Sequence, residues 1–351
     1  MAIFGNRSGG IRRPGRTMIV ASLAISLVAT LSACGSGEGS ANEVTLLTHD
    51  SFQLPQEIVD QFQTETGMKL KIVHSGDAGA LSATISLTPG SPKGDAVFGI
   101  DNTFAARPIE AKALLPYVSP AAANGAAEFN VEGSAGELTA VDRGDVCINI
   151  DDAWFDTRGI EAPTQFDQLT EPKYRDLTVL MDPSTSSPGM GFLLATLGRF
   201  RNHAQDYWRG MVSNGAKIVS GWEVAYNQEF SAGAGHGKRP IVVSYASSPA
   251  ATPGTSALLD SCFAQVEYIG VLRGAANTEG AKKLVDFMLS PTVQAALPTS
   301  MYVYPVQKGT PLPASWRQRA PIPAWTVTMT PAYISAHREE WLNEWRAVVK
   351  G

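Results

Sequence analysis

Asp182-Pro-Ser-Thr-Ser-Ser-Pro-Gly-Met-Gly191, followed directly by Phe192-Leu-Leu-Ala-Thr-Leu-Gly198, is the stretch around which the chain is organised. The pattern predicts a helix with Pro188 in its first turn and one of the two preceding serines as its cap. The first N–H groups of a helix have no partner within it, and Gly189 and Gly191 allow close approach, so this end can bind an anion. A well-capped core helix without a ligand explains the same pattern, and both interpretations stay open.

The first 33 residues have the composition of a secretory signal. Four arginines precede an apolar segment of fourteen residues, 18–31, which is shorter than the roughly twenty that a membrane-spanning helix needs. The end of this segment, Leu31-Ser-Ala-Cys34, resembles the bacterial lipobox. We therefore expect residues 1–33 to be a lipoprotein signal peptide, Cys34 to carry a lipid anchor at the outer face of the cytoplasmic membrane, and residues 34–42 to be a flexible tether. A membrane-spanning anchor is the alternative.

Charge and length limit the class of protein. Removal of the signal takes away four arginines and no acidic residue, which changes the formal net charge from −5 to −9. Nucleic-acid-binding surfaces are basic, so this balance argues against nucleic acid as a partner. The remaining 318 residues exceed what one hydrophobic core comfortably organises, and we expect two lobes.

Two cysteines remain after the signal, Cys147 and Cys262. Disulfides form in the oxidising space outside the cytoplasm, and an even pair in an exported chain favours one bond between them. Both cysteines lie in apolar surroundings, so two buried free thiols are the alternative.

The chain opens with a β-α-β pattern, which favours a parallel sheet. Strands are predicted over 43–48, 69–73 and 95–100, with a helix over 55–66 that ends at Gly67. Polar residues follow the first strand at 49–51 and the third at 101–103. The carboxyl edge of such a sheet is where ligands bind. Capping of the helices that follow is the alternative role of Asp50 and Asp101.

A second lobe is predicted to begin near residue 150. Its expected strands end in Trp222 and Tyr245, and a later strand crosses back to the first lobe; these strands are predicted over 174–181, 217–223, 240–245 and 265–272. The expected boundaries are 43–145 for the first part of lobe 1, 146–265 for lobe 2, and 266–351 for the return to lobe 1 with the C-terminal helices.

The sequence favours binding over catalysis. It contains no Gly-x-Ser-x-Gly and no His-Glu-x-x-His motif, and its five histidines lack the spacing of metal ligands, so no metal, cofactor or enzymatic activity is expected. Aromatic rings with carboxylates suit an organic cation. The helix start at 182–191 with Tyr245 suits a phosphate. Together they predict a ligand with both groups, held in a cleft between the lobes.

Seven motifs stand in order along the chain: Thr48-His-Asp-Ser-Phe52, Phe98-Gly-Ile-Asp-Asn102, Asp182-Pro-Ser-Thr-Ser-Ser-Pro-Gly-Met-Gly-Phe-Leu-Leu194, Gly221-Trp-Glu-Val-Ala-Tyr226, Ser244-Tyr-Ala-Ser-Ser-Pro-Ala250, Phe287-Met-Leu-Ser-Pro291 and Pro298-Thr…Tyr304-Pro-Val306. In this order they resemble the periplasmic thiamine-binding proteins of bacterial ABC importers. The resemblance extends from about residue 43 to 349. It implies an α/β fold of the two-lobed type II periplasmic binding protein kind, with a ligand cleft between lobes and hinge crossings.

The resemblance also implies a set of ligand-binding residues: His49, Asp50, Asp101, Asn102, Ser186, Ser187, Gly189, Trp222, Tyr245 and Tyr302. Ser186 and its neighbours would face a ligand phosphate. The chain departs from the family at several positions. Tyr302 stands where the family has a tryptophan, His49 and Ala251 stand where it has tyrosines, and the tryptophan expected after Phe52 is missing. Fewer aromatic rings therefore surround the ligand.

The implied function is that of a monomeric, extracytoplasmic solute-binding protein. It would bind thiamine or thiamine phosphates and deliver them to an ABC permease driven by a separate ATPase. A different cargo in the same fold is the alternative, namely an organophosphate, a polyamine or ferric iron, for which Tyr302 and Tyr304 are candidate ligands. A hydrolase of phosphate esters acting through Ser186 is the alternative from another class.

Overall fold

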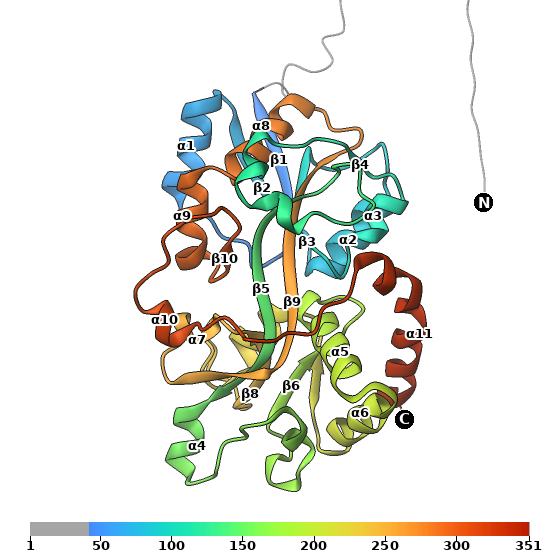
Figure 1. Ribbon diagram of the computed structural model, residues 1–351, viewed down its shortest axis with the longest axis vertical. Helices are drawn as coiled ribbons and strands as arrows, with labels where there is room; N and C mark the ends of the chain where they lie inside the picture. The colour runs from blue at the N-terminus through green and yellow to red at the C-terminus, as the bar shows by residue number, and fades with distance from the viewer. Residues whose placement is uncertain (1–41, 351) are drawn as a thin grey trace, which may run out of the picture. The chain divides into compact units, whose positions relative to one another are not determined.

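Two long antiparallel strands, β5 (Thr139–Asp151) and β9 (Thr255–Leu272), run side by side through the computed structural model and connect its two lobes (Figure 1). The structure describes residues 42–350, so the predicted signal peptide, the anchor at Cys34 and nearly all of the tether lie outside the described residues. All described strands form one sheet in the order β2-β1-β3-β9-β5-β8-β6-β7, with β10 paired to β5 and β4 to β9.

The other strands are short and lie on both sides of this pair: β1 (Glu43–Thr48), β2 (Lys69–His74), β3 (Ala96–Asp101), β4 (Leu114–Leu115), β6 (Thr178–Met181), β7 (Lys217–Val219), β8 (Ile241–Tyr245) and β10 (Tyr304–Pro305). The α-helices are α1 (Gln56–Thr66), α2 (Ala78–Ser86), α3 (Ala106–Glu110), α4 (Asp152–Arg158), α5 (Ser187–Phe200), α6 (Ala204–Ser213), α7 (Ser248–Ala251), α8 (Thr278–Met288), α9 (Pro291–Ser300), α10 (Trp316–Arg319) and α11 (Pro331–Lys350).

The shorter helical turns follow a 3-10 or a π pattern. The 3-10 turns are η1 (Pro120–Asn124), η2 (Ala126–Phe129), η3 (Phe166–Thr170), η4 (Pro172–Tyr174) and η5 (Arg201–His203), and the π-helical turn is η6 (Glu223–Glu229). Within residues 42–350, no helix combines the length and the apolar character that crossing a bilayer requires.

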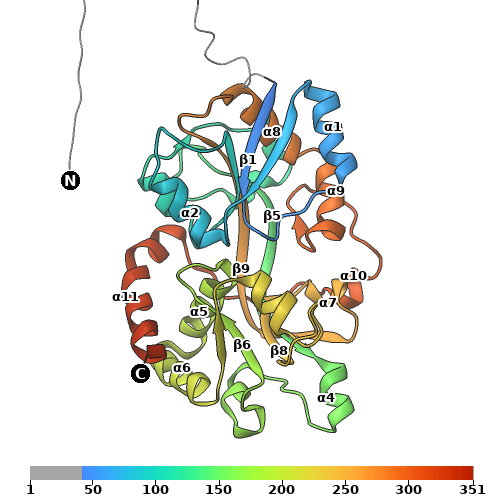
Figure 2. The ribbon, with the colours of Figure 1, turned by 180° about the vertical axis from the view of Figure 1, so that it is seen from behind.

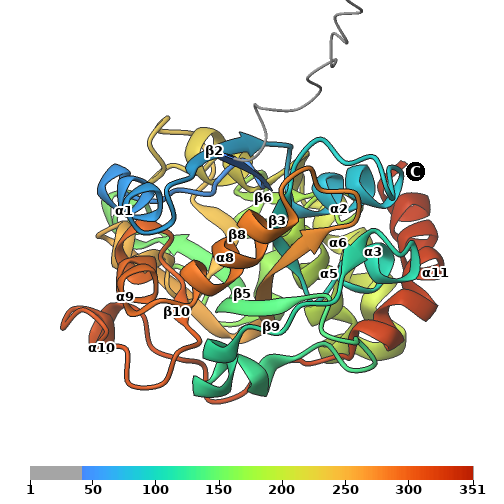
Figure 3. The same cartoon turned by 90° about the horizontal axis from the view of Figure 1, so that it is seen from above.

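The first lobe is built on the parallel strands β1, β2 and β3, as the β-α-β pattern predicts. Successive residues of β1 point to opposite faces, so Leu46 packs with Phe62 of α1 and Leu284 of α8, whereas Leu47 packs with Leu81 of α2. Seen from behind and from above, α1 and α9 lie on one side of these strands and α2 on the other (Figures 2 and 3). Both faces of the strands are therefore buried.

The second lobe surrounds α5, the helix predicted from the 182–191 stretch. Ser186 is its cap, and its hydroxyl accepts a hydrogen bond from the N–H of Gly189 at 3.2 Å. Every residue from Ser187 to Thr196 is buried, which explains why this helix is apolar on all sides. It packs against the sheet, where β6 pairs in parallel with β7 and β8, and β8 pairs with β5.

The C-terminal helix α11 contacts both lobes. Trp345 packs edge-on against Trp208 of α6, with ring centroids 5.6 Å apart, and Trp341 is buried as well, so both tryptophans serve packing. Arg338 of the same helix donates a hydrogen bond to the carbonyl of Thr103, which follows β3 in the first lobe, at 2.8 Å. The predicted lobe boundaries at residues 146 and 265 stay a prediction. Helix α11 contacts residues of both lobes.

Two predicted strands have different limits in the structure, and one helix contains a proline. Strand β9 begins at Thr255 rather than at 265, because its first part pairs with Ile148–Asp151 of β5 although its own sequence does not alternate. The strand expected over 217–223 ends at Val219, and Trp222 directly precedes η6. Helix α9 continues through Pro298 to Ser300, although proline usually breaks a helix interior.

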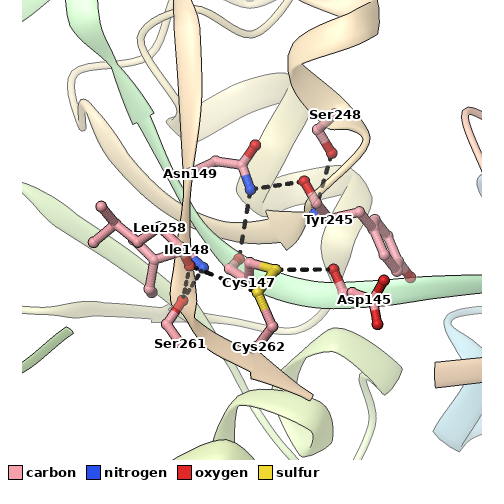
Figure 4. Close-up of a disulfide and its surroundings, with 9 residues drawn as sticks. All are labelled: Asp145, Cys147, Ile148, Asn149, Tyr245, Ser248, Leu258, Ser261 and Cys262. Carbon is pink, nitrogen blue, oxygen red and sulfur yellow. Dashed lines mark hydrogen bonds between the residues drawn. A yellow bond between two sulfur atoms is a disulfide. The ribbon is translucent and has the colours of Figure 1, made fainter. Parts of the chain in front are cut away.

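A disulfide between Cys147 and Cys262 joins β5 to β9 (Figure 4). The ladder between the two strands changes register between Val146 and Ile148, and the bond bridges the strands at this irregularity. Beside it, the hydroxyl of Ser261 accepts a hydrogen bond from the N–H of Ile148 at 2.9 Å. The two connecting strands are thus linked covalently as well as by their ladder.

Replacing both cysteines by alanine (C147A with C262A) should lower the free energy of unfolding by about 2–4 kcal/mol, because the bond closes a long loop, with a sequence separation of 115, and so restricts the unfolded chain. Urea unfolding followed by circular dichroism measures the change. Equal unfolding midpoints for the oxidised protein and the double variant would contradict a stabilising role of the bond.

Candidate ligand-binding site

A cavity of about 280 Å³ lies among segments of both lobes. Its walls come from the end of β1, the η6 turn with the loop after it, the end of β8 with α7, strand β9 and the residues that follow α9. The lining residues are His49, Ser51, Gln53, Trp222, Glu223, Tyr226, Asn227, Ala232, Gly233, Ala234, Tyr245, Ser248, Ala251, Thr252, Glu267, Ser300, Met301, Tyr302 and Val303.

Two stacked rings form one wall of the cavity. Trp222 and Tyr226 lie with ring centroids 4.9 Å apart and planes 12° from parallel. The indole N–H of Trp222 donates to the hydroxyl of Ser244 at 2.9 Å, and the hydroxyl of Tyr226 donates to Thr252 at 2.9 Å. Because both rings are fixed by these bonds, they present a preorganised flat surface to a ligand.

Tyr302 forms another part of the wall and has unusual backbone geometry. Its φ of 55° lies in the left-handed region, which is strained for a residue with a side chain. Its carbonyl accepts a hydrogen bond from the hydroxyl of Ser247 at 2.6 Å, so contacts with the segment after β8 help to hold this conformation. The residue as a whole stays 37% exposed. An exposed ring beside the cavity is available to a ligand.

Buried ionisable groups form the inner part of the cavity. His49 Nε2 lies 3.3 Å from Glu267 Oε1, and each of these residues is only 6% exposed. Burial opposes the charged imidazole, but the attraction of Glu267, helped by Asp77 and Asp50, outweighs burial and raises the pKa of His49 above 6.5. Directly across the ladder from Glu267 stands Asp142 of β5. Burial and the charge of Glu267 raise the pKa of Asp142 well above its usual range.

Asp101 and Asn102 do not line the cavity. Asp101 is fully buried and accepts hydrogen bonds from the hydroxyls of Ser187 and Thr103. Burial raises the pKa of Asp101 to about 6, although these hydrogen bonds oppose the shift. Asn102 exchanges hydrogen bonds with the backbone of β9, donating to Ala264 and accepting from Val266. In this form both residues connect parts of the fold.

The helix start at 182–191 is also closed off from the cavity. Ser186 and Ser187 are buried, with Ser186 capping α5 and Ser187 bonded to Asp101. A Cβ at Gly189 would stand 2.8 Å from the carbonyl oxygen of Met181, so this glycine is required for the packing of α5 onto the end of β6. The residues that suggested an anion site therefore have structural partners here.

Asp50 lies in a neighbouring cavity of about 210 Å³ and accepts a hydrogen bond from the N–H of Gly76 at 2.9 Å. Acidic side chains are prominent around both cavities: Glu223 and Glu267 in the larger one, and Asp50, Asp77 and Glu223 in the smaller one. Among the described residues that line them, none is lysine or arginine. The arrangement can hold a flat organic cation by ring stacking and by opposite charge.

The sequence did not single out three residues of this region: Tyr226, Glu267 and Asp77. Glu267 lies in the apolar run of β9, and a charged residue in a buried strand is itself a signal because such residues are buried only with partners. For Asp77 the available signal was its position as an N-terminal cap of α2. In residues 42–350, no three His, Cys, Asp or Glu side chains gather as a metal site would require.

The structure has two lobes joined by long connecting strands, and aromatic and acidic residues from both lobes line its cavity. These features define a two-lobed solute-binding protein. The chain belongs to the family of bacterial extracellular solute-binding proteins, because the model of this family matches residues 92–328. The predicted fold class is thereby confirmed, and the family consists of binding proteins, in agreement with the prediction of a protein that is not an enzyme.

Individual relatives cover most of the chain. The thiamine-binding periplasmic protein of Escherichia coli (strain K12) is 28% identical over 326 residues, which are 87% of this chain and 93% of that protein. A solved structure of a periplasmic thiamin binding protein matches with a TM-score of 0.77 at 26% identity, covering 88% and 96% of the two chains. An apo ferric ion-binding protein A from Pasteurella haemolytica has the same fold, with a TM-score of 0.68, 17% identity, and 88% and 98% covered.

The buried carboxyl of Asp101 should make stability depend on pH. Its pKa of about 6 in the folded protein exceeds the ordinary value of 3.8, so the folded state binds the proton more tightly than the unfolded state. The contribution of Asp101 to the free energy of unfolding is therefore present below about pH 4. Up to about 3 kcal/mol of it is lost as the pH rises through about 6. Urea midpoints between pH 4 and 7 should fall less steeply for Asp101→Asn than for the wild type. If the urea midpoints of the two proteins fell equally steeply with pH, the raised pKa of Asp101 would be contradicted. Asp60→Asn, on the exposed face of α1, is the control.

Proposed function

We propose that the chain binds thiamine or thiamine phosphates outside the cytoplasm and delivers them to an ABC permease driven by a separate ATPase. The observation that carries the proposal is the cavity lined by fixed aromatic rings and by Glu223 and Glu267, without lysine or arginine among its described lining residues. Thiamine combines aromatic rings with a permanent positive charge, which matches this lining. The similarity to the thiamine-binding protein of Escherichia coli supports the same cargo.

The proposal includes the anchoring of the protein. The signal-like residues 1–33 and the lipobox-like end at Cys34 support export followed by lipid attachment at the outer face of the cytoplasmic membrane. Residues 34–42 would then be the tether that leaves the lobes free to reach the permease as a monomer.

Among the predicted ligand contacts, Trp222, Tyr245, Tyr302 and His49 line the cavity and are the ones we propose as direct contacts. Burial, with the charges of Glu267 and Asp77, raises the pKa of Tyr245 well above its usual range, so its hydroxyl stays neutral and can donate a hydrogen bond. Direct contact by Asp50, Asp101, Asn102, Ser186, Ser187 and Gly189 stays a prediction.

The alternative functions receive less support from the geometry. A ferric site would need clustered tyrosines, whereas the buried hydroxyl of Tyr304 donates to the carbonyl of Ala320 and its ring packs on Trp316, outside the cavity lining. Hydrolysis through Ser186 would need an accessible hydroxyl, whereas this one is buried and caps α5.

Calorimetric titration of the full chain, purified in mild detergent, with thiamine should give saturable one-to-one binding with a Kd of about 1 μM or below. The aromatic walls and the acids are fixed before binding, which lowers the cost of organising the site. Titration with spermidine and with ferric citrate tests the other cargoes. Absence of binding to thiamine by protein that is folded and ligand-free would contradict the proposed cargo.

Trp222→Ala should weaken thiamine binding by about 1–3 kcal/mol, because stacking of a ring on a flat heterocycle contributes this much in comparable sites. The same titration measures the loss. Trp325→Ala is the matched control, since Trp325 is 59% exposed and does not line the cavity. Equal losses in the two variants, or no loss at Trp222, would remove this ring from the binding site.

A further inference from the structure

Asp77 of the first lobe makes hydrogen bonds to two segments of the second lobe. One carboxylate oxygen accepts from the N–H of Ala78 at 2.7 Å, which caps α2, and from the N–H of Ser187 at 3.3 Å. The other oxygen accepts from the N–H of Trp222 at 2.9 Å. Nearby, the N–H of Gly79 donates to the carbonyl of Thr185 at 3.0 Å. A carboxylate of lobe 1 thus stands at the start of α5, next to the aromatic wall.

Each backbone group at the start of α5 is accounted for. The N–H of Ser187 is bonded to Asp77, and Pro188 has none. The N–H of Gly189 donates to the hydroxyl of Ser186 at 3.2 Å, and that of Met190 to the carbonyl of Ser186 at 2.9 Å. The positive end of the helix therefore has no free donor for a ligand anion, because an anion of the protein already takes its place.

The space beside this helix start is also unfavourable for a phosphate. The cavity of about 210 Å³ contains Asp50, Asp77 and Glu223 among its lining residues and neither lysine nor arginine among the described ones. A phosphate ester carries between one and two negative charges at neutral pH, so it would meet three carboxylates of the same sign. Gly221 approaches so closely that a Cβ there would stand 2.9 Å from the Asp77 carboxylate, which leaves little room between them.

We propose that Asp77 is a specificity-determining residue that occupies the anion position at the start of α5, so that the cleft selects the unphosphorylated organic cation over its phosphate esters. This inference rests on the proposed function and narrows its cargo. The carboxylate of Asp77 already accepts the hydrogen bond of the Ser187 N–H, so no phosphate from the ligand is needed to satisfy the helix start.

The test compares thiamine, thiamine monophosphate and thiamine diphosphate in calorimetric titrations of the full chain. The wild type should bind thiamine at least tenfold more tightly than either ester. Asp77→Ser should shift this ratio at least tenfold toward the monophosphate, since serine still caps α2 but leaves the N–H groups of Ser187 and Trp222 open. Asp77→Asn keeps the size and removes the charge, which separates the effect of charge from that of space.

Asp60→Ser is the matched control, because it removes an exposed carboxylate on α1 and should leave the ratio unchanged. Equal or tighter binding of the esters by the wild type would overturn the inference, as would ratios in both Asp77 variants within threefold of the wild type. Should Asp77→Ser fail to fold, the wild-type ratio and Asp77→Asn decide the question. Failure of the proposed function has a different signature, namely no binding of any of the three compounds.

Discussion

The antiparallel pairing of β5 with β9 is the interaction on which the rest of the structure depends. These two strands share one ladder that begins in the first lobe and ends in the second, and each lobe adds its own parallel strands to the edges of this pair. Backbone hydrogen bonds of such a ladder have no water to replace them when both faces are covered, so the pairing is strongly held. The disulfide between Cys147 and Cys262 adds a covalent link at the point where the register changes.

The same ladder creates the chemistry of the site. Cross-strand register sets Asp142 opposite Glu267, and the end of β1 brings His49 against Glu267, so three ionisable groups share one buried region. Burial, together with the charge of Glu267, raises the pKa of Asp142 well above its usual range. The aromatic wall comes from the other lobe. A ligand in the cavity therefore contacts the ladder and both lobes at the same time, which is how binding energy can favour the closed arrangement.

Much of the fold could be predicted from local sequence signals. The residues that were missed owe their roles to contacts between segments far apart in the sequence. Gly67 and Ser186 act through neighbouring residues, so the ends of α1 and α5 could be read from the sequence. Trp222 and Tyr302 follow a strand and a helix, Tyr245 ends strand β8, and all three line the cavity. Glu267 and Asp77 acquire their roles from β5 and from the other lobe, which no local pattern encodes. The 182–191 stretch shows this most clearly, because its capping was predictable but Asp77, far away in sequence, fills its anion position.

Helix α11 adds a third connection between the lobes to the two that strands β5 and β9 make. Its tryptophans are anchored in the second lobe, while Arg338, packed over the ring of Phe104, holds the carbonyl of Thr103 in the first. Burial lowers the pKa of Arg338 to about 10, yet the group stays charged at neutral pH, so its bond persists. A rotation that moves Thr103 away from α11 would break this contact. A helix on the outside of the molecule, none of whose residues line the cavity, thus connects the two lobes in addition to strands β5 and β9.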